Sequence, residues 1–364
     1  MKKCLVGVCG IGTGHTVRQM IIAEYLKKYS DIVFVVSGRR GSNSLLNGYK
    51  VIHSQVPWII TDARGVNWRD TSVHASNNEI TFLNISKTLA SCIELLGGEP
   101  DIIISDYEPF VPLLAYSKNI PLITIDQQSK YLGYLTPSLA NLTRDMEASR
   151  LSLLFPKANK RFSVSFFPLN QFEENMDFKV DILPAIVPND ILALSKNVMD
   201  IKDKLITVYI SSFAKYEQGA SIIKCLTKYK DYRFNIFSNH SFKNSEYACN
   251  LNLSFFSYDR NKFLNSVINS RFLIATAGHQ LISEAVYLKK PILAIPVESY
   301  EQFFNAKMCK ELYIGDTFDN FNLENLDMFI KNAEKGKYCG MYDLSMNRAY
   351  VIEKIIDYIN NILR

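Results

Sequence analysis

The stretch RFLIATAGHQLISEAVYLKKPILAIPVESYEQFFNAKMCKELYIG, residues Arg271 to Gly315, decides the fold class of this 364-residue chain. Its hydrophobic pattern predicts a strand at 272–275, a helix from Gln280 to Leu288, a strand at 292–296 and a further helix. Gly278 stands between the first strand and the first helix, where a glycine lets the backbone turn closely. Strand, helix and strand in this order form a parallel βαβ unit, so the sequence predicts an α/β fold.

The turn and the start of the first helix have the properties of an anion site. The first N–H groups of a helix have no intrahelical partner, and the helix dipole adds partial positive charge there. Gly278, His279 and Gln280 are therefore predicted to bind a diphosphate without a metal ion. Glu284 lies about one turn further in, and its carboxylate is predicted to accept hydrogen bonds from both hydroxyls of a ribose. Together these residues predict a nucleotide site.

Polar residues also follow the second strand of this stretch. Glu301 and Gln302 follow the carboxyl end of that strand, which is where open α/β sheets bind ligands. Their side chains are predicted to hold the hydroxyls of a sugar attached to the nucleotide. Asn305 follows Gln302 by three residues and shares its helix face. The alternative is an ordinary βαβ unit with a glutamate and a glutamine on its surface.

A second glycine-rich turn, Gly10-Ile-Gly12-Thr-Gly14, follows a predicted first strand at 4–9. Its spacing is not the G-x-G-x-x-G of a dinucleotide fingerprint, and the second strand ends in Ser37-Gly38-Arg39 rather than in an acidic residue. The distinctive residue is His15, which begins the following helix. We assign Gly14, beside it, to the donor-binding residues.

His15 is the candidate general base. The dipole at a helix N-terminus favours a neutral imidazole, and a general base must be neutral. Asp106 ends a later short apolar strand, and parallel strands bring such ends to one sheet edge, so Asp106 is predicted to lie near His15. The alternative is that His15 only caps its helix or touches phosphate, while Asp106 caps its own loop.

The donor stretch resembles the nucleotide-sugar-binding region of GT-B glycosyltransferases. That region contains a glycine turn, a helix with a glutamate, a proline, an acidic residue before glutamine, and an Asn-Ala pair. The matching residues here are Thr276-Ala277-Gly278, Glu284, Pro291, Glu301-Gln302 and Asn305-Ala306. Relatives usually place a cationic residue where Thr276 stands, so His279 or a residue from elsewhere is expected to supply that charge.

The resemblance covers nearly the whole chain. Val8-Cys-Gly-Ile-Gly-Thr-Gly-His15-Thr-Val-Arg18, Ile104–Pro109 and Pro121–Asp126 look like a poorly characterised prokaryotic subfamily with a GxGxGHxxR motif. It is related to UDP-glycosyltransferases and to the N-acetylglucosaminyltransferase that forms lipid II. The resemblance implies two Rossmann-like domains that face each other across a cleft. It also implies an inverting, metal-independent hexosyltransferase with His15 as base and Asp106 as its partner.

The resemblance also implies the ligands. A UDP-sugar is the expected donor, a small molecule, glycan or lipid-linked sugar is the expected acceptor, and no cofactor is expected. The start of UDP-sugar hydrolases is similar to Gly14-His15-x-x-Arg18, so a nucleotide-sugar hydrolase or epimerase is the alternative. No D-x-D triplet occurs in the sequence, so a metal that neutralises the diphosphate would lack its usual ligands.

The remaining candidate residues extend both sites. Arg18 and Glu108 are expected to contact the acceptor. Ser211 and Ser212 follow a predicted strand and are expected to donate hydrogen bonds to the diphosphate. Tyr258 is expected to contact the base of the nucleotide.

Chain length and hydrophobic pattern predict two domains. The alternation of strands and helices restarts near 204–210, after a region that several prolines interrupt. We expect an acceptor domain at 1–170, a donor domain at 171–345 and a C-terminal helix at 346–364. That helix either crosses back to the first domain or caps its own.

Composition excludes some classes of protein. The net charge is +5, but basic and acidic residues are interspersed, so a nucleic-acid partner is not expected. Seven cysteines without C-x-x-C spacing indicate reduced thiols and a cytoplasmic protein. Residues 151–162 mix apolar and basic side chains. They predict either peripheral contact with the inner face of an anionic membrane or a helix end with solvated lysines.

Overall fold

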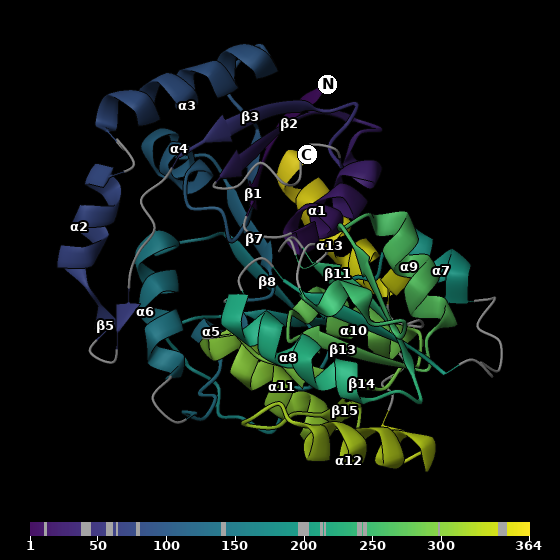
Figure 1. The fold of residues 1–364 in the computed structure, drawn as a ribbon. Coiled ribbons are helices and arrows are strands. Elements are labelled where there is room, and N and C mark those ends of the chain that lie inside the picture. Colours follow the sequence, from purple (N-terminus) through teal and green to yellow (C-terminus); the bar gives the residue numbers. More distant parts are fainter. Residues whose placement is uncertain are drawn as a thin grey trace. The chain divides into compact units, whose positions relative to one another are not determined.

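The structure is a computed structural model whose chain divides into two compact units, unit 1 (Met1–Pro188 and Met346–Arg364) and unit 2 (Asn189–Ser345) (Figure 1). The described residues are 1–10, 13–37, 45–55, 61–62, 65–77, 81–139, 143–195, 204–211, 214, 216–238, 242, 246–297, 299–340 and 348–364. The division at Pro188 lies later than the expected boundary at 170, because the strand at Asp181–Pro184 pairs within unit 1.

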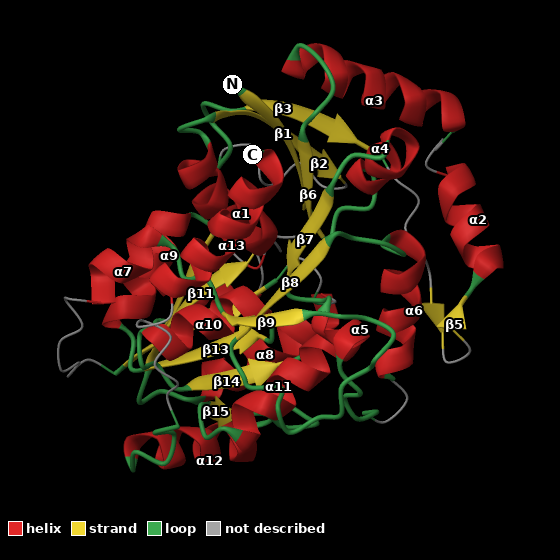
Figure 2. Ribbon diagram, turned by 180° about the vertical axis from the view of Figure 1, so that it is seen from behind, coloured by secondary structure: helices red, strands yellow, loops and turns green. Residues whose placement is uncertain are grey.

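Unit 1 contains a seven-stranded parallel sheet in the order β3-β2-β1-β6-β7-β8-β9 (Figure 2). Its strands are β1 (Lys2–Cys9), β2 (Ser30–Ser37), β3 (Lys50–Ser54), β6 (Ile102–Asp106), β7 (Leu122–Asp126), β8 (Lys160–Ser165) and β9 (Asp181–Pro184). Most residues of β1, β2, β6, β7 and β8 are buried, as expected for a parallel sheet covered on both faces. Val8 pairs with Asp106, so the end of β6 lies beside the end of β1.

Helices flank this sheet. They are α1 (Thr13–Leu26), α2 (Trp68–Asn77), α3 (Phe82–Leu96), α4 (Val111–Lys118), α5 (Lys130–Gly133), α6 (Arg144–Leu154) and α13 (Arg348–Leu363). A short antiparallel pair, β4 (Thr61–Asp62) and β5 (Gly65–Val66), precedes α2. Local signals set the ends of α3: the Thr81 side chain caps its N-terminus, and Gly97 ends it in the left-handed conformation.

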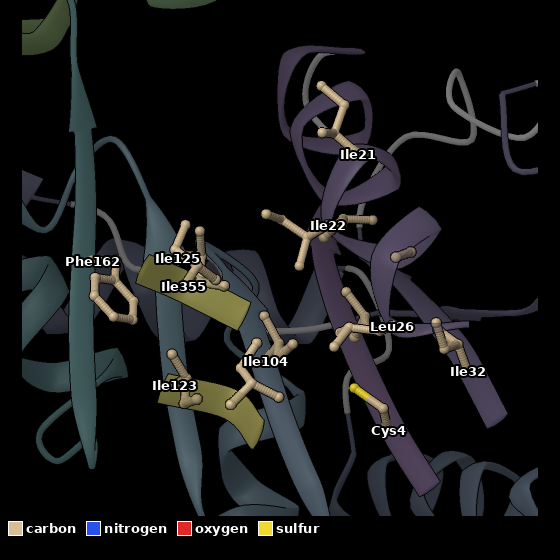
Figure 3. Packing of buried hydrophobic residues seen from close by; sticks show 14 of the residues in the cluster. Cys4, Ile21, Ile22, Leu26, Ile32, Ile104, Ile123, Ile125, Phe162 and Ile355 are labelled. Atoms are coloured by element: carbon tan, nitrogen blue, oxygen red, sulfur yellow. The ribbon is translucent and has the colours of Figure 1, made fainter. Parts of the chain in front are cut away.

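The C-terminal helix α13 belongs to unit 1, where it packs beside α1 (Figure 1). Its Ile352, Ile355 and Ile359 are buried in the same cluster as Ile104 and Ile125 of the sheet. Figure 3 shows Ile355 next to those strand residues. The last residues of the chain therefore complete a core that the first residues began.

Unit 2 contains a six-stranded parallel sheet in the order β12-β11-β10-β13-β14-β15. Its strands are β10 (Leu205–Ile210), β11 (Arg233–Ser238), β12 (Leu253–Phe256), β13 (Phe272–Thr276), β14 (Ile292–Ile295) and β15 (Gly315–Asp316). Its helices are α7 (Asn189–Ser195), α8 (Tyr216–Lys228), the 3-10 helix η3 (Glu246–Cys249), α9 (Arg260–Asn269), α10 (His279–Tyr287), α11 (Tyr300–Glu311) and α12 (Leu323–Glu334). The strand order reverses between β10 and β13, which is where open α/β sheets bind ligands.

Residues 151–162 do not form one amphipathic surface. Helix α6 ends at Leu154 and strand β8 begins at Lys160. Leu151, Phe155 and Phe162 are buried, so these side chains are not available to a membrane surface. The second interpretation, a helix end in the core, is the one that the structure favours. No helix in the described ranges is long and apolar enough to cross a membrane.

Candidate active site

In unit 1, the ends of β1 and β6 bring His15 and Asp106 together. Helix α1 begins shortly after β1, and β6 ends at Asp106 opposite Val8. The Nδ1 atom of His15 lies 2.7 Å from Oδ1 of Asp106. The Asp106 side chain is fully buried, whereas 15% of the His15 side chain is exposed. The expected proximity of the two residues is therefore present in the structure.

Asp106 is also held by two further residues of α1. Arg18 donates from Nε to Oδ2 at 2.8 Å and from Nη2 to Oδ1 at 2.7 Å, and Gln19 donates from Nε2 to Oδ2 at 2.9 Å. Burial alone would raise the pKa of Asp106, but Arg18 and His15 outweigh it and hold this pKa below its usual value. Asp106 is therefore an ionised carboxylate with both oxygens occupied.

This arrangement corrects the expected role of Arg18. Its side chain is only 2% exposed and its guanidinium forks onto Asp106, so it does not face an acceptor. We had not predicted Gln19 as a site residue. The spacing contained a signal for both, because His15, Arg18 and Gln19 stand at positions i, i+3 and i+4 on one helix face.

A second residue that the sequence analysis missed, Tyr107, holds the His15 ring from another side. The two rings are stacked, with centroids 6.2 Å apart and planes 13° apart. Tyr107 has a φ of 53°, a left-handed backbone conformation that turns the chain sharply after β6. Its hydroxyl donates to Oε1 of Glu147 at 2.6 Å, and Arg150 donates to Oε2 of the same carboxylate at 2.6 Å. The His15 ring thus has a contact on an edge and one on a face.

Contrary to what we had expected from the sequence, Glu108 is not placed to contact the sugar acceptor. It is fully buried, and its carboxylate accepts hydrogen bonds from the N–H groups of Phe110 at 3.0 Å and Val111 at 2.8 Å. Glu108 therefore satisfies the N-terminus of α4. Gly7 of β1 makes room for it, because a Cβ at that position would lie 2.6 Å from Oε2 of Glu108.

Glu108 predicts an unusual dependence of stability on pH. Burial raises its pKa to about 7, although the two N–H donors oppose the shift. A raised pKa means that the stabilisation is fully present below the unfolded value, near 4.5, and is lost as the pH rises through about 7. Relative to Glu108→Gln, the wild-type free energy of unfolding should fall by about 3 kcal/mol over this range. Urea unfolding at several pH values measures the difference, and parallel curves for the two proteins would contradict it.

In unit 2, the predicted anion site lies at the turn after β13. Gly278 is the N-cap of α10, and in the described part of the chain no side chain caps this helix. A Cβ on Gly278 would meet no described atom within 4 Å. The His279 side chain is buried, which does not favour a contact between its ring and a diphosphate. The backbone of the turn, rather than the imidazole, is the candidate anion site.

Glu284 already has partners inside the protein. It is 2% exposed, and its Oε1 accepts from Nη2 of Arg260 at 3.1 Å and from Nε2 of Gln280 at 3.2 Å. Arg260 in turn donates from Nε to Oδ2 of Asp190 at 2.8 Å. Burial raises the pKa of Glu284, and Arg260 opposes that shift. The sequence analysis missed Arg260 and Asp190, since no spacing rule connects positions 190, 260 and 284.

The side chains of α11 shape the neighbouring loops. Gln302 uses its Oε1 to accept from the N–H of Val297 at 3.1 Å, and Asn305 donates to the carbonyl of Ala277 at 3.0 Å. Asn305 therefore fixes the turn that precedes Gly278. Glu301 is half-buried at the start of α11, after Ser299 as the N-cap. The structure places both predicted sugar contacts, Glu301 and Gln302, at the carboxyl end of β14.

The other predicted donor residues of unit 2 also lie at this edge of the sheet, whereas Gly14 lies in α1 of unit 1. Ser211 follows β10 and Thr276 ends β13, and these two strands are paired. Ser212 lies outside the described residues. Tyr258 follows β12 and packs against Tyr209, with ring centroids 5.7 Å apart. Among the described residues, no group of three His, Cys, Asp or Glu side chains could hold a metal ion.

Comparisons with known proteins agree with this architecture. The model of a family described as glycosyl transferase family 1 matches residues 2–333. The glycotransferase of kitacinnamycin has a similar structure, with a TM-score of 0.69 and 12% identity over 99% of this chain and 98% of that one. A comparison with curated proteins gives no match.

Two further solved structures are similar over almost the full length of both chains. Phytolacca americana UGT2 complexed with UDP-2fluoro-glucose and pterostilbene has a TM-score of 0.65 and 12% identity, covering 100% of each chain. Acinetobacter baumannii MurG has a TM-score of 0.59 and 12% identity, covering 98% of this chain and 100% of that one. At such identity the likeness concerns the fold, and it confirms the predicted GT-B class.

Proposed function

The chain belongs to glycosyl transferase family 1, and on that premise we propose an inverting transfer of a sugar from a UDP-sugar to a hydroxyl acceptor. The observation that carries the proposal is the 2.7 Å contact between His15 and the buried carboxylate of Asp106. A partly exposed imidazole oriented by a carboxylate is the arrangement that a general base needs.

His15 would act through its second ring nitrogen. With Asp106 ionised, Nδ1 carries a hydrogen towards the carboxylate, and Nε2 keeps its lone pair. In the proposed step, Nε2 takes the proton of the acceptor hydroxyl while that oxygen forms a bond to the anomeric carbon. The bond between this carbon and the phosphate oxygen breaks, and UDP leaves with the electron pair. Attack opposite the leaving group inverts the anomeric centre.

Unit 2 would bind the donor at the N-terminus of α10. The backbone of Gly278 and the following helix start would stabilise the negative charge that develops on the departing diphosphate. Glu284 would accept hydrogen bonds from the ribose, while Glu301 and Gln302 would contact the sugar. This description requires neither a metal ion nor another cofactor, and we propose that the reaction uses none.

Binding of UDP tests the proposed donor. We expect UDP and a UDP-sugar to raise the melting temperature of the protein, because a ligand that binds only the folded state stabilises it. Glu284→Gln should weaken UDP binding by about 10- to 100-fold, since it removes hydrogen bonds to a charged group. Glu334→Gln is the matched control in the same unit, because Glu334 pairs with Arg271 in a more exposed ion pair. Isothermal titration calorimetry measures both variants.

An assay of the wild-type protein with and without an acceptor distinguishes transfer from hydrolysis. With a UDP-sugar and no added acceptor, the proposed transferase releases free sugar slowly, and a hydroxyl acceptor accelerates release of UDP. Rapid sugar release without an acceptor would show that the protein is a nucleotide-sugar hydrolase rather than a transferase. If no nucleotide raises the melting temperature and none binds in calorimetry, the proposed donor site is wrong.

A further inference from the structure

A chain of three charged side chains lies at the proposed ribose contact. Asp190 comes from α7, Arg260 begins α9, and Glu284 lies in α10. The guanidinium of Arg260 contacts both carboxylates: Nε and Nη2 donate to Asp190 at 2.8 and 3.1 Å, and Nη2 also donates to Glu284 at 3.1 Å. Exposure increases along the chain, from 2% for Glu284 through 17% for Arg260 to 40% for Asp190. The cation thus separates a buried carboxylate from a more exposed one.

The two oxygens of Glu284 are not equivalent in this arrangement. Oε1 accepts from both Arg260 and Gln280, at 3.1 and 3.2 Å. In the described part of the chain, Oε2 has one long contact, 3.5 Å from Nη1 of Arg260. A carboxylate oxygen has two lone pairs, so Oε2 keeps acceptor capacity for a ligand hydroxyl.

We propose that Arg260 is a positioning residue of the donor site, which holds Glu284 through Oε1 and leaves its Oε2 as the acceptor for the ribose hydroxyls. Asp190 fixes the guanidinium by accepting from two of its nitrogens. This inference rests on the proposed function, because it assigns the ribose contact to Glu284. It adds a residue that does not itself touch the nucleotide.

The charges around Glu284 account for the role of Arg260. Burial of a carboxylate disfavours its charged form, and a nearby cation opposes this effect. Among the described residues, Arg260 and Gln280 favour the ionised form of Glu284, whereas Asp190 disfavours it; Tyr258 acts on Arg260. Without the cation, burial and Asp190 both raise the pKa of Glu284. As the pH falls, the carboxyl group then takes up a proton and loses acceptor capacity.

A purely structural role for Arg260 predicts a different result. Arg260 joins three helices, so its replacement lowers the melting temperature in either case. Only the proposed role predicts that replacement of Arg260 changes the pH dependence of UDP affinity relative to wild type. The pH profile of binding, rather than the stability, is therefore the informative measurement.

The experiment compares UDP binding by calorimetry at pH 8.5 and pH 6 in wild type, Arg260→Gln and Arg260→Lys. For Arg260→Gln, we expect the loss of UDP affinity between pH 8.5 and pH 6 to be about tenfold larger than in wild type. That is the effect of a one-unit rise in the pKa of Glu284. Arg260→Lys restores a cation and should follow wild type more closely. Arg271→Gln, which breaks the more exposed pair with Glu334, should match wild type. Titration of the phosphate of UDP is common to all four proteins and cancels in the comparison.

A second readout does not depend on UDP. Carbon-13 NMR of labelled glutamate, with the Glu284 signal assigned by its absence in Glu284→Gln, should show a higher pKa for Glu284 in Arg260→Gln than in wild type. Should Arg260→Gln fail to fold, Arg260→Met, which also removes the cation, is compared with wild type in the same way. An Arg260→Gln or Arg260→Met protein that binds UDP with the wild-type pH profile overturns the role of Arg260 alone. A wild-type protein that does not bind UDP overturns the proposed donor instead.

Discussion

Replacement of His15 by alanine should slow sugar transfer by about 100- to 10,000-fold, the usual contribution of a general base. UDP affinity should change by less than about twofold, because in the proposed reaction His15 acts on the acceptor hydroxyl rather than on UDP. Turnover of a UDP-sugar with a hydroxyl acceptor and calorimetry with UDP measure the two quantities.

The controls for this prediction come from the same unit. Asp106→Asn should lower the rate as well, because an amide does not hold the imidazole in the required tautomer. His74→Ala, in α2, should leave the rate unchanged. If His15→Ala transfers sugar at the wild-type rate, His15 is not the base.

Arg18→Met should destabilise unit 1 by about 3–5 kcal/mol, because it leaves the buried charge of Asp106 without its guanidinium partner. Methionine keeps most of the apolar volume, so the change tests the charge. Urea unfolding at neutral pH measures the loss. Lys118→Met, which breaks an exposed ion pair with Glu99, is the control and should change stability by less than about 1 kcal/mol.

The loss in Arg18→Met should also depend on pH with a defined sign. Arg18 holds the pKa of Asp106 below its usual value, so its stabilisation is present above the unfolded pKa, near 3.8, and is lost as the pH falls through the folded value. The deficit of the variant should therefore shrink in acid. The double variant Arg18→Met with Asp106→Asn should lose less stability than the sum of the losses in the two single variants, since a neutral amide does not need the cation. A deficit that is constant with pH and additive would show that packing alone explains it.

The sequence predicted the βαβ unit of the donor stretch almost to the residue. The strand expected at 272–275 is Phe272–Thr276, and the helix expected at Gln280–Leu288 is His279–Tyr287. Buried parallel strands are short apolar runs between turns, and this pattern is local. The strand β9, Asp-Ile-Leu-Pro, was not predicted, because it is short and ends in proline, which is unusual for a strand.

The relative position of His15 and Asp106 could be predicted because sheet topology determines it. Asp106 was placed near His15 because the ends of parallel strands share one edge. Arg260 and Asp190 could not be predicted in this way, since their contact with Glu284 depends on how three helices pack. Glu108 was misassigned because a glutamate in a strand-end loop looks exposed in sequence, whereas here it satisfies the start of α4.

Helix α13 has a consequence for how this protein is made. Unit 2 is one continuous stretch, whereas unit 1 needs residues from both ends of the chain. During synthesis on the ribosome, domains generally fold as units once their residues have emerged. Here the central unit emerges whole before Ile352, Ile355 and Ile359 can fill the core begun by β1. The residues of β1 are translated before these three isoleucines and must await them, so part of the apolar surface of unit 1 stays uncovered until then.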